Sequence, residues 1–167
     1  NLITLKPVIY VCNVDENSII NGNKFSENFK NHIKSNIILI SADIESQIAT
    51  LSNEEQSDFL SSLGLEESGL NKIIKEGYNT LNLITYFTSG EMESRAWTIE
   101  KNTLAPDAAG KIHTDFKSGF IRAETISSED FITCKGETKA RELGKLRSEG
   151  KEYAVQDGDV MHFLFNN

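Results

Sequence analysis

Two short apolar runs in the first half of the chain predict neighbouring buried strands. One covers residues 7–13 and the other residues 37–40. Continuous apolar runs are typical of parallel sheets that are covered on both faces. Between the two runs, Phe25, Phe29 and Ile33 are spaced by four residues, which predicts an amphipathic helix over 24–35. The order strand, helix, strand indicates a right-handed βαβ unit.

The polar and apolar positions that follow predict three more helices. The first covers 42–51. The second begins after an N-cap at Ser52 or Asn53 and ends near Gly64, and the third begins at Ser68 with its apolar residues on one side. This last helix is expected to pack on the sheet and lead into the second half of the chain.

The pattern changes near residue 82. Alternating residues predict strands at 83–88 and 94–99, paired about a turn at Ser89-Gly90. A helix is expected to begin at Pro106, followed by a strand at 120–126, a short helix from Ser128 and a last strand at 160–165. The charged residues 137–147 are expected to form a solvated helix or an ordered excursion. Hairpin, helix and further strands in this order favour a compact α+β domain of the ubiquitin-like β-grasp type.

Charge and composition narrow the function classes. The formal net charge is −8 and 38% of the residues are hydrophobic, which suits a globular protein. A chain this acidic does not bind nucleic acid over its whole surface. Residues 110–151 nevertheless hold nine Lys/Arg against seven Asp/Glu, so an RNA or ribosome contact is expected there. There is no apolar run of 18 residues, and only two cysteines occur, so we expect a cytoplasmic protein without membrane contact.

Polar residues follow both strands of the predicted βαβ unit. Asn13-Val14-Asp15-Glu16 follows the first and Ser41-Ala42-Asp43 the second, where ligands of open α/β sheets bind. They match the two base-holding loops of GTPase-type P-loop proteins, in which Asn-Lys-x-Asp recognises guanine. Glu16 in place of Asp and Val14 in place of Lys are expected to weaken guanine recognition and to accommodate adenine. An Asn at a strand end is also a common turn residue, and this alternative stays open.

A second candidate region combines basic and aromatic residues between glycines. Lys111, His113, Lys117 and Arg122 lie near Phe116 and Phe120, a mixture that can contact RNA phosphates and bases. The alternative is that the aromatic rings belong to the core and the charges are solvated. The three histidines have no spacing typical of a metal site.

Four stretches resemble the YchF-type Obg-like ATPases. They are LITLKPVIYVCNVDE, LGLEESGLNKIIKEGYNTLNLITYFTSGEMESRAWTI, APDAAGKIHTDFKSGFIRAETISSEDF and EGKEYAVQDGDVMHFLFN. The resemblance implies α/β plus α+β architecture: the C-terminal part of a Rossmann-like P-loop NTPase domain at 1–82, followed by a β-grasp TGS domain at 83–167. It also implies a ribosome-associated hydrolase that uses ATP with Mg²⁺, in a family that includes GTP-binding proteins.

The same resemblance assigns roles to single residues. Asn13 and Val14 would contact the adenine edge in the loop that ends at Glu16, and Ser41 and Ala42 would close the other side of the base. The sequence contains no Gly-x-x-x-x-Gly-Lys-Ser/Thr, which supplies the phosphate cradle and a Mg²⁺ ligand. We therefore expect no hydrolysis and no bound cofactor in these residues alone. The alternative function is a non-enzymatic TGS-type module that binds RNA or protein.

Overall fold

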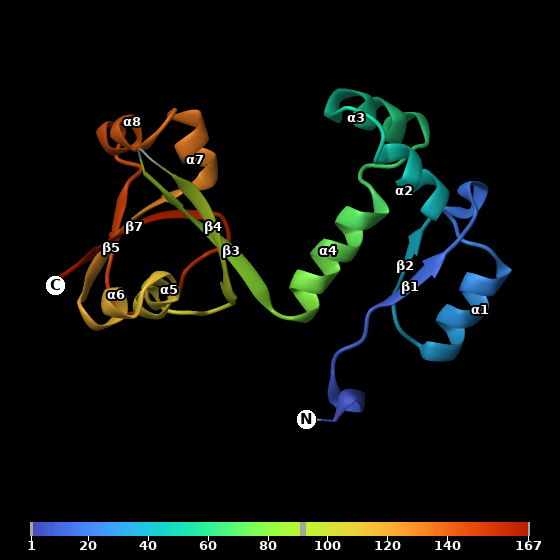
Figure 1. The fold of residues 1–167 in the computed structure, drawn as a ribbon, viewed down its shortest axis with the longest axis horizontal. Helices are drawn as coiled ribbons and strands as arrows, with labels where there is room; N and C mark the ends of the chain where they lie inside the picture. The colour runs from blue at the N-terminus through green and yellow to red at the C-terminus, as the bar shows by residue number, and fades with distance from the viewer. Residues whose placement is uncertain (1, 91–92, 167) are drawn as a thin grey trace. The chain divides into compact units, whose positions relative to one another are not determined.

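The computed structural model describes residues 2–90 and 93–166 (Figure 1). The chain forms two compact units, Asn1–Leu81 and Asn82–Asn167. Each unit has its own sheet and its own buried apolar cluster. The two units are therefore described one after the other.

The first unit is built on two parallel strands, β1 (Tyr10–Asn13) and β2 (Ile37–Ile40), paired in register from Tyr10 with Ile37 to Asn13 with Ile40. Helix α1 (Lys24–Ile33) connects them, and the side chain of Asn23 caps its first turn. Two short 3₁₀ helices, η1 (Ile3–Leu5) and η2 (Glu16–Ser18), lie on either side of β1 in the sequence. The βαβ unit predicted from the apolar runs is present.

Three helices follow β2: α2 (Ala42–Ile48), α3 (Asn53–Ser62) and α4 (Gly69–Thr80). Val14, Ile19, Ile44 and Ile48 form the buried cluster of the unit. Glu45 of α2 fixes the start of α4, because its carboxylate accepts hydrogen bonds from the backbone N–H groups of Gly69 at 2.6 Å and Leu70 at 3.3 Å. A carboxylate at a helix N-terminus satisfies amides that have no partner inside the helix.

The second unit contains a five-stranded mixed sheet in the order β4-β3-β7-β5-β6. Its strands are β3 (Leu83–Ser89), β4 (Ser94–Glu100), β5 (Phe120–Ser127), β6 (Arg147–Glu149) and β7 (Asp159–Phe165). The hairpin predicted around residue 90 is present as the antiparallel pair β3–β4. Residues 91 and 92 of its connection lie outside the described residues.

Short helices of this unit, labelled in Figure 1, contribute side chains to two buried clusters. Helix α5 (Ala105–Ile112) places Ala105, Ala108 and Ala109 in the main core, beside Tyr86, and α6 (Thr114–Ser118) adds Phe116. A smaller cluster joins Ile126 of β5 to α7 (Ser128–Thr133) and α8 (Glu137–Glu142). The Tyr86 hydroxyl donates to the Ala108 carbonyl at 2.8 Å, and burial raises the pKa of Tyr86.

A buried carboxylate organises the end of the second unit. Asp159, only 3% exposed, accepts hydrogen bonds from the Tyr153 hydroxyl at 2.7 Å, the Gln156 backbone N–H at 2.9 Å and the Arg147 guanidinium at 3.2 Å. Burial, together with the hydrogen bond to Asp159, raises the pKa of Tyr153 to about 12. These contacts fasten the loop before β7 to β6.

The structure of the second unit differs from the sequence-based expectation in two places. The helix expected over 137–147 ends at Glu142, and residues Arg147–Glu149 instead pair with β5 as an edge strand. Gly144, with φ of +68°, turns the chain between them. Helix α6 was not expected, because five residues are too few to show a helical period.

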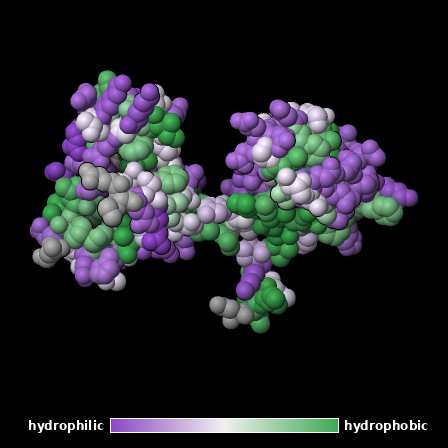
Figure 2. Space-filling model, turned by 45° about the horizontal axis from the view of Figure 1, so that its top comes forward, coloured by the Kyte–Doolittle hydropathy of each residue, from purple (hydrophilic) through white to green (hydrophobic). Residues whose placement is uncertain are grey.

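The first unit exposes a series of large apolar side chains, and Figure 2 shows hydrophobic residues gathered on one side of it. They are Leu2, Ile3, Leu5, Val8, Val11, Ile20, Phe25, Phe29, Leu70, Ile74 and Leu81. Within the described residues, none of the helices has the length and apolar content needed to cross a bilayer.

Candidate functional site

The carboxyl ends of β1 and β2 bring the two predicted base loops together. The backbone N–H of Ala42 donates to the Asn13 side-chain Oδ1 at 3.0 Å, across 29 positions of sequence. This bond fixes the Asn13 amide with its oxygen toward Ala42, so its Nδ2 group remains the donor for a ligand. Two of the five sequence-predicted base residues are thus in direct contact.

The side chains of Val14 and Ser41 are buried. The Val14 N–H donates to the Ile40 carbonyl at 2.8 Å, and its side chain belongs to the core of the unit at 9% exposure. Ser41 is 1% exposed, and its Oγ has no hydrogen-bond partner among the described residues. A buried hydroxyl without a partner is uncommon, and here it lies at the end of β2 beside Ala42.

Both carboxylates of the first loop are already occupied by neighbours. Asp15 accepts from the Ser18 backbone N–H at 3.1 Å and from its hydroxyl at 3.0 Å, which closes the turn of η2. Glu16 accepts from the Gln47 side-chain amide of α2 at 2.9 Å. Sequence reasoning missed Gln47, because it lies five residues beyond Ala42 and belongs to no motif.

A hollow of about 290 Å³ lies beside the first loop. Its lining is Cys12, Asn13, Val14, Asn23, Phe25 and Ser26. Asn13 and Val14 therefore face an opening, with the aromatic ring of Phe25 at its border. Glu16, Ser41 and Ala42 are not among the lining residues. The hydrogen bond between Ala42 and Asn13 connects the second loop to a residue that lines the hollow.

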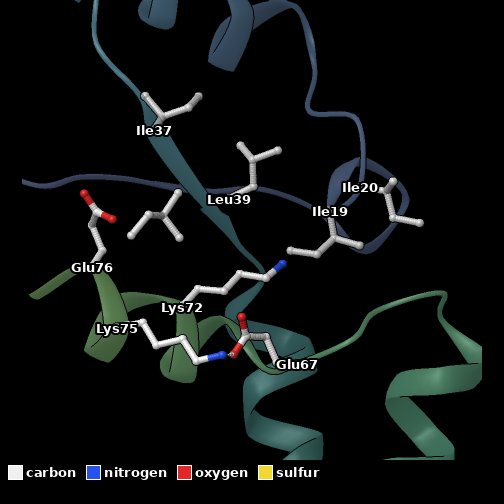
Figure 3. A pocket seen from close by; sticks show the side chains of 9 residues that line it. Ile19, Ile20, Ile37, Leu39, Glu67, Lys72, Lys75 and Glu76 are labelled. Carbon is white, nitrogen blue, oxygen red and sulfur yellow. Dashed lines mark ion pairs between the residues drawn. The ribbon is translucent and has the colours of Figure 1, made fainter. Parts of the chain in front are cut away.

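A second hollow, of about 340 Å³, lies between β2 and α4 (Figure 3). Ile37 and Leu39 of β2, with Ile19 and Ile20, give it apolar walls. Its charged side comes from α4 and the loop before it, where Lys75 pairs with Glu67 at 2.6 Å and Lys72 extends toward Ile19. None of the residues predicted to bind the base lines it.

Of the basic residues predicted to contact RNA, Lys111 lies on α5, Lys117 on α6 and Arg122 on β5, and His113 lies between the two helices. Three of the four have an acidic neighbour. Lys117 forms an ion pair with Asp107, His113 lies 3.4 Å from the Asp115 carboxylate, and Arg122 lies 3.9 Å from Glu124. For Lys111, exposed in the last turn of α5, the described residues include no ion-pair partner. Phe116 and Phe120 pack in or against the core, as the alternative interpretation held.

Metal-binding chemistry is not evident in the part of the chain that the structure describes. No group of three or more His, Cys, Asp or Glu side chains is placed to hold a metal ion there.

Comparisons with known proteins agree with the fold. Residues 83–166 match the family model YchF-GTPase_C, which is described as a protein of unknown function. The chain is 54% identical over 168 residues to the ribosome-binding ATPase YchF of Escherichia coli O157:H7, covering 99% of this chain and 46% of that protein. It is 49% identical over 171 residues to the protein of the same name from Bacillus subtilis, covering 99% of this chain and 47% of that protein.

The structure also resembles a solved relative. The YchF GTPase of Schizosaccharomyces pombe superposes with a TM-score of 0.83 at 40% identity, over 96% of this chain and 44% of that one. The mixed α/β fold is therefore that of YchF GTPases. The chain spans about half the length of the curated relatives it matches. Because the family model covers half of its residues, the chain belongs to the YchF-GTPase_C family.

Proposed function

We propose that this chain carries the base-recognition loops of a nucleotide site and a TGS-type β-grasp domain of a ribosome-associated ATPase. Residues 1–82 would be the C-terminal part of the P-loop domain and residues 83–167 the TGS domain. The names of the relatives, ribosome-binding ATPase and GTPase, support this assignment.

The observation that supports base recognition most directly is the hydrogen bond between Asn13 and Ala42. It joins the two loops at the carboxyl ends of parallel strands, where nucleotides bind in open α/β folds. Asn13 Nδ2 would donate to a purine ring nitrogen, Val14 would contribute its backbone, and Ser41 and Ala42 would close the opposite side.

Hydrolysis would need groups beyond these residues. ATP and Mg²⁺ are the expected ligands of the full-length protein, whereas this sequence contains no phosphate-loop motif. The chain would therefore bind a base weakly and would not hydrolyse ATP. Phosphate release that depends on Mg²⁺, measured with the purified chain, would contradict this part of the proposal.

Titration of the ¹⁵N-labelled chain with AMP, followed by NMR, tests base recognition. We expect shifts at the amides of Val14 and Ala42, and roughly fivefold weaker binding for Asn13→Ala, the loss of one hydrogen bond. Asn79→Ala, an exposed change on α4, is the control. If Asn13→Ala and Asn79→Ala bind AMP equally well, the assignment of Asn13 is wrong.

The second unit would bind the ribosome by contacting its RNA, and the protein would act in the cytoplasm. The candidate contact residues are Lys111, His113, Lys117 and Arg122. The ion pairs of Lys117 and Arg122 lower the net positive charge of this surface. Lys111 is therefore the candidate cation with the least local neutralisation. The alternative is a TGS-type module that binds protein or RNA without any enzymatic role.

Co-sedimentation of the chain with ribosomes tests whether these basic side chains carry the binding to the ribosome. Charge reversal of Lys111, Lys117 and Arg122 is expected to reduce the bound fraction and its dependence on salt. Reversal of Lys6, Lys101 and Lys151, which are also exposed, changes the net charge equally and is the matched control. If both sets of variants lose ribosome binding equally, the net charge of the chain alone explains the effect, and the proposal of a specific basic surface is rejected.

A further inference from the structure

The side chain of Glu16 is held by a hydrogen bond from Gln47 of helix α2. Glu16 occupies the place of the carboxylate that recognises guanine in GTPase-type loops. Its Oε1 accepts from Gln47 Nε2 at 2.9 Å, so the carboxylate is directed to helix α2. This bond joins the first loop to helix α2 and involves other residues than the Asn13–Ala42 contact.

Guanine recognition by a carboxylate depends on the direction in which its two oxygens point. The N1–H and the exocyclic amine of guanine are adjacent donors, and a carboxylate binds them both when both of its oxygens face the base. One oxygen of Glu16 is engaged by Gln47, and Asp15 is closed onto Ser18. Neither acidic side chain of the loop presents the pair of acceptors.

Adenine places the opposite demand on this edge. Its N1 is an acceptor, so a carboxylate facing it would set lone pairs against lone pairs. A carboxylate held by Gln47 avoids that repulsion, while the Asn13 amide can still donate to the ring nitrogen that both purines share. The hydrogen bond between Gln47 and Glu16 therefore lowers the affinity for guanine and removes the repulsion between the carboxylate and adenine N1.

We infer that Gln47 is a positioning residue that sets purine preference by holding Glu16 away from the base. The inference rests on the base site proposed above and adds to it the group that selects the base. Gln47 is exposed and contributes no core packing, so replacing it is expected to leave the fold intact.

The test compares the binding of AMP and GMP to the whole chain by NMR titration. Gln47→Ala removes the donor, and Gln47→Glu keeps the shape but repels Glu16. Both variants are expected to bind GMP better relative to AMP than the wild-type chain does. The ratio of the two dissociation constants should change by about two- to tenfold, which is the effect of one hydrogen bond. Ser46→Ala, exposed on the same helix, is the control and is expected to leave the ratio unchanged.

The double variant Gln47→Ala with Glu16→Gln tests whether Gln47 acts by positioning Glu16 or only by stabilising the fold. Without a carboxylate at position 16 the gain toward GMP should disappear, which a merely structural role of Gln47 would not produce. An unchanged ratio in Gln47→Ala, with AMP still shifting Ala42, overturns the inference and leaves the base site standing. Absence of any AMP-induced shift at Val14 and Ala42 in the wild-type chain overturns the base site and the inference with it.

Discussion

Asp159 illustrates how much of the second unit depends on a single buried side chain. Its two oxygens serve three donors, one from a side-chain hydroxyl, one from the backbone and one from a guanidinium. A buried carboxylate is costly unless its hydrogen bonds are made, and here they are. The same residue begins β7, the strand that joins β3 to β5.

Asp159→Asn should destabilise the second unit by roughly 1.5–3 kcal/mol, the usual value for a hydrogen bond to a charged group. The amide keeps the size but turns one acceptor into a donor that faces other donors. Chemical denaturation measures the change. Glu152→Gln, an exposed neighbour, is the control and should stay within about 0.5 kcal/mol of wild type. Equal stability of both variants would show that the network is dispensable.

Some contacts of the candidate site could be predicted from the sequence and others could not. Asn13 and Ala42 were brought together correctly, because strand ends in a parallel pair must meet at one edge. Gln47 could not be foreseen, because its contact depends on where α2 starts and on the rotation of one turn of helix. The ion pair of Lys117 with Asp107 likewise joins two helices, α6 and α5, whose packing no motif in the sequence indicates.

Helix α4 depends on a glycine at its start. A Cβ at Gly69 would lie 2.6 Å from Ile40 Cγ2 and 2.9 Å from the Glu45 Oε1 that caps the helix. The missing side chain therefore lets α4 approach β2 and lets the carboxylate reach its amides. Gly77, on the same helix, has no neighbour within 4 Å of such an atom.

The two glycines are expected to respond in opposite directions. Gly69→Ala should cost roughly 1–3 kcal/mol because it crowds a packed contact. Gly77→Ala should stabilise the first unit by about 0.5–1 kcal/mol, since alanine favours the helix and nothing opposes its methyl group. Hydrogen exchange of α4 amides measures both. Similar effects of the two changes would show that the crowding at Gly69 relaxes freely.

Elements with their own local signals were the ones predicted well. β2 has the predicted bounds, and α3 begins after Ser52 with a capping box to Glu55. Hydrogen bonds from Ser52 lower the pKa of Glu55. By contrast, residues Arg147–Glu149 became a strand because β5 offers them a partner far away in sequence, and their charged composition gave no sign of it.

The molecule as a whole consists of two units with separate cores, and this has a consequence for unfolding. Trp97, the only tryptophan, packs against the core of the second unit. Asp159→Asn is expected to lower the denaturation midpoint seen by Trp97 fluorescence, whereas Gly69→Ala should leave that midpoint unchanged. A shift of the Trp97 signal by Gly69→Ala would mean that the two units unfold as one.

The hydrogen bond that spans 29 residues also sets an order of events during folding. Parallel pairing of β1 with β2 requires the whole crossover, including α1, to close first, and contacts so distant in sequence form late. The hairpin of β3 and β4, in contrast, joins neighbouring residues. Trp97 lies in this hairpin, but the core it packs against includes Met161 and Phe163 of β7, so its native environment also waits for a distant strand. AMP, in turn, would bind only to chains that have completed the crossover between β1 and β2.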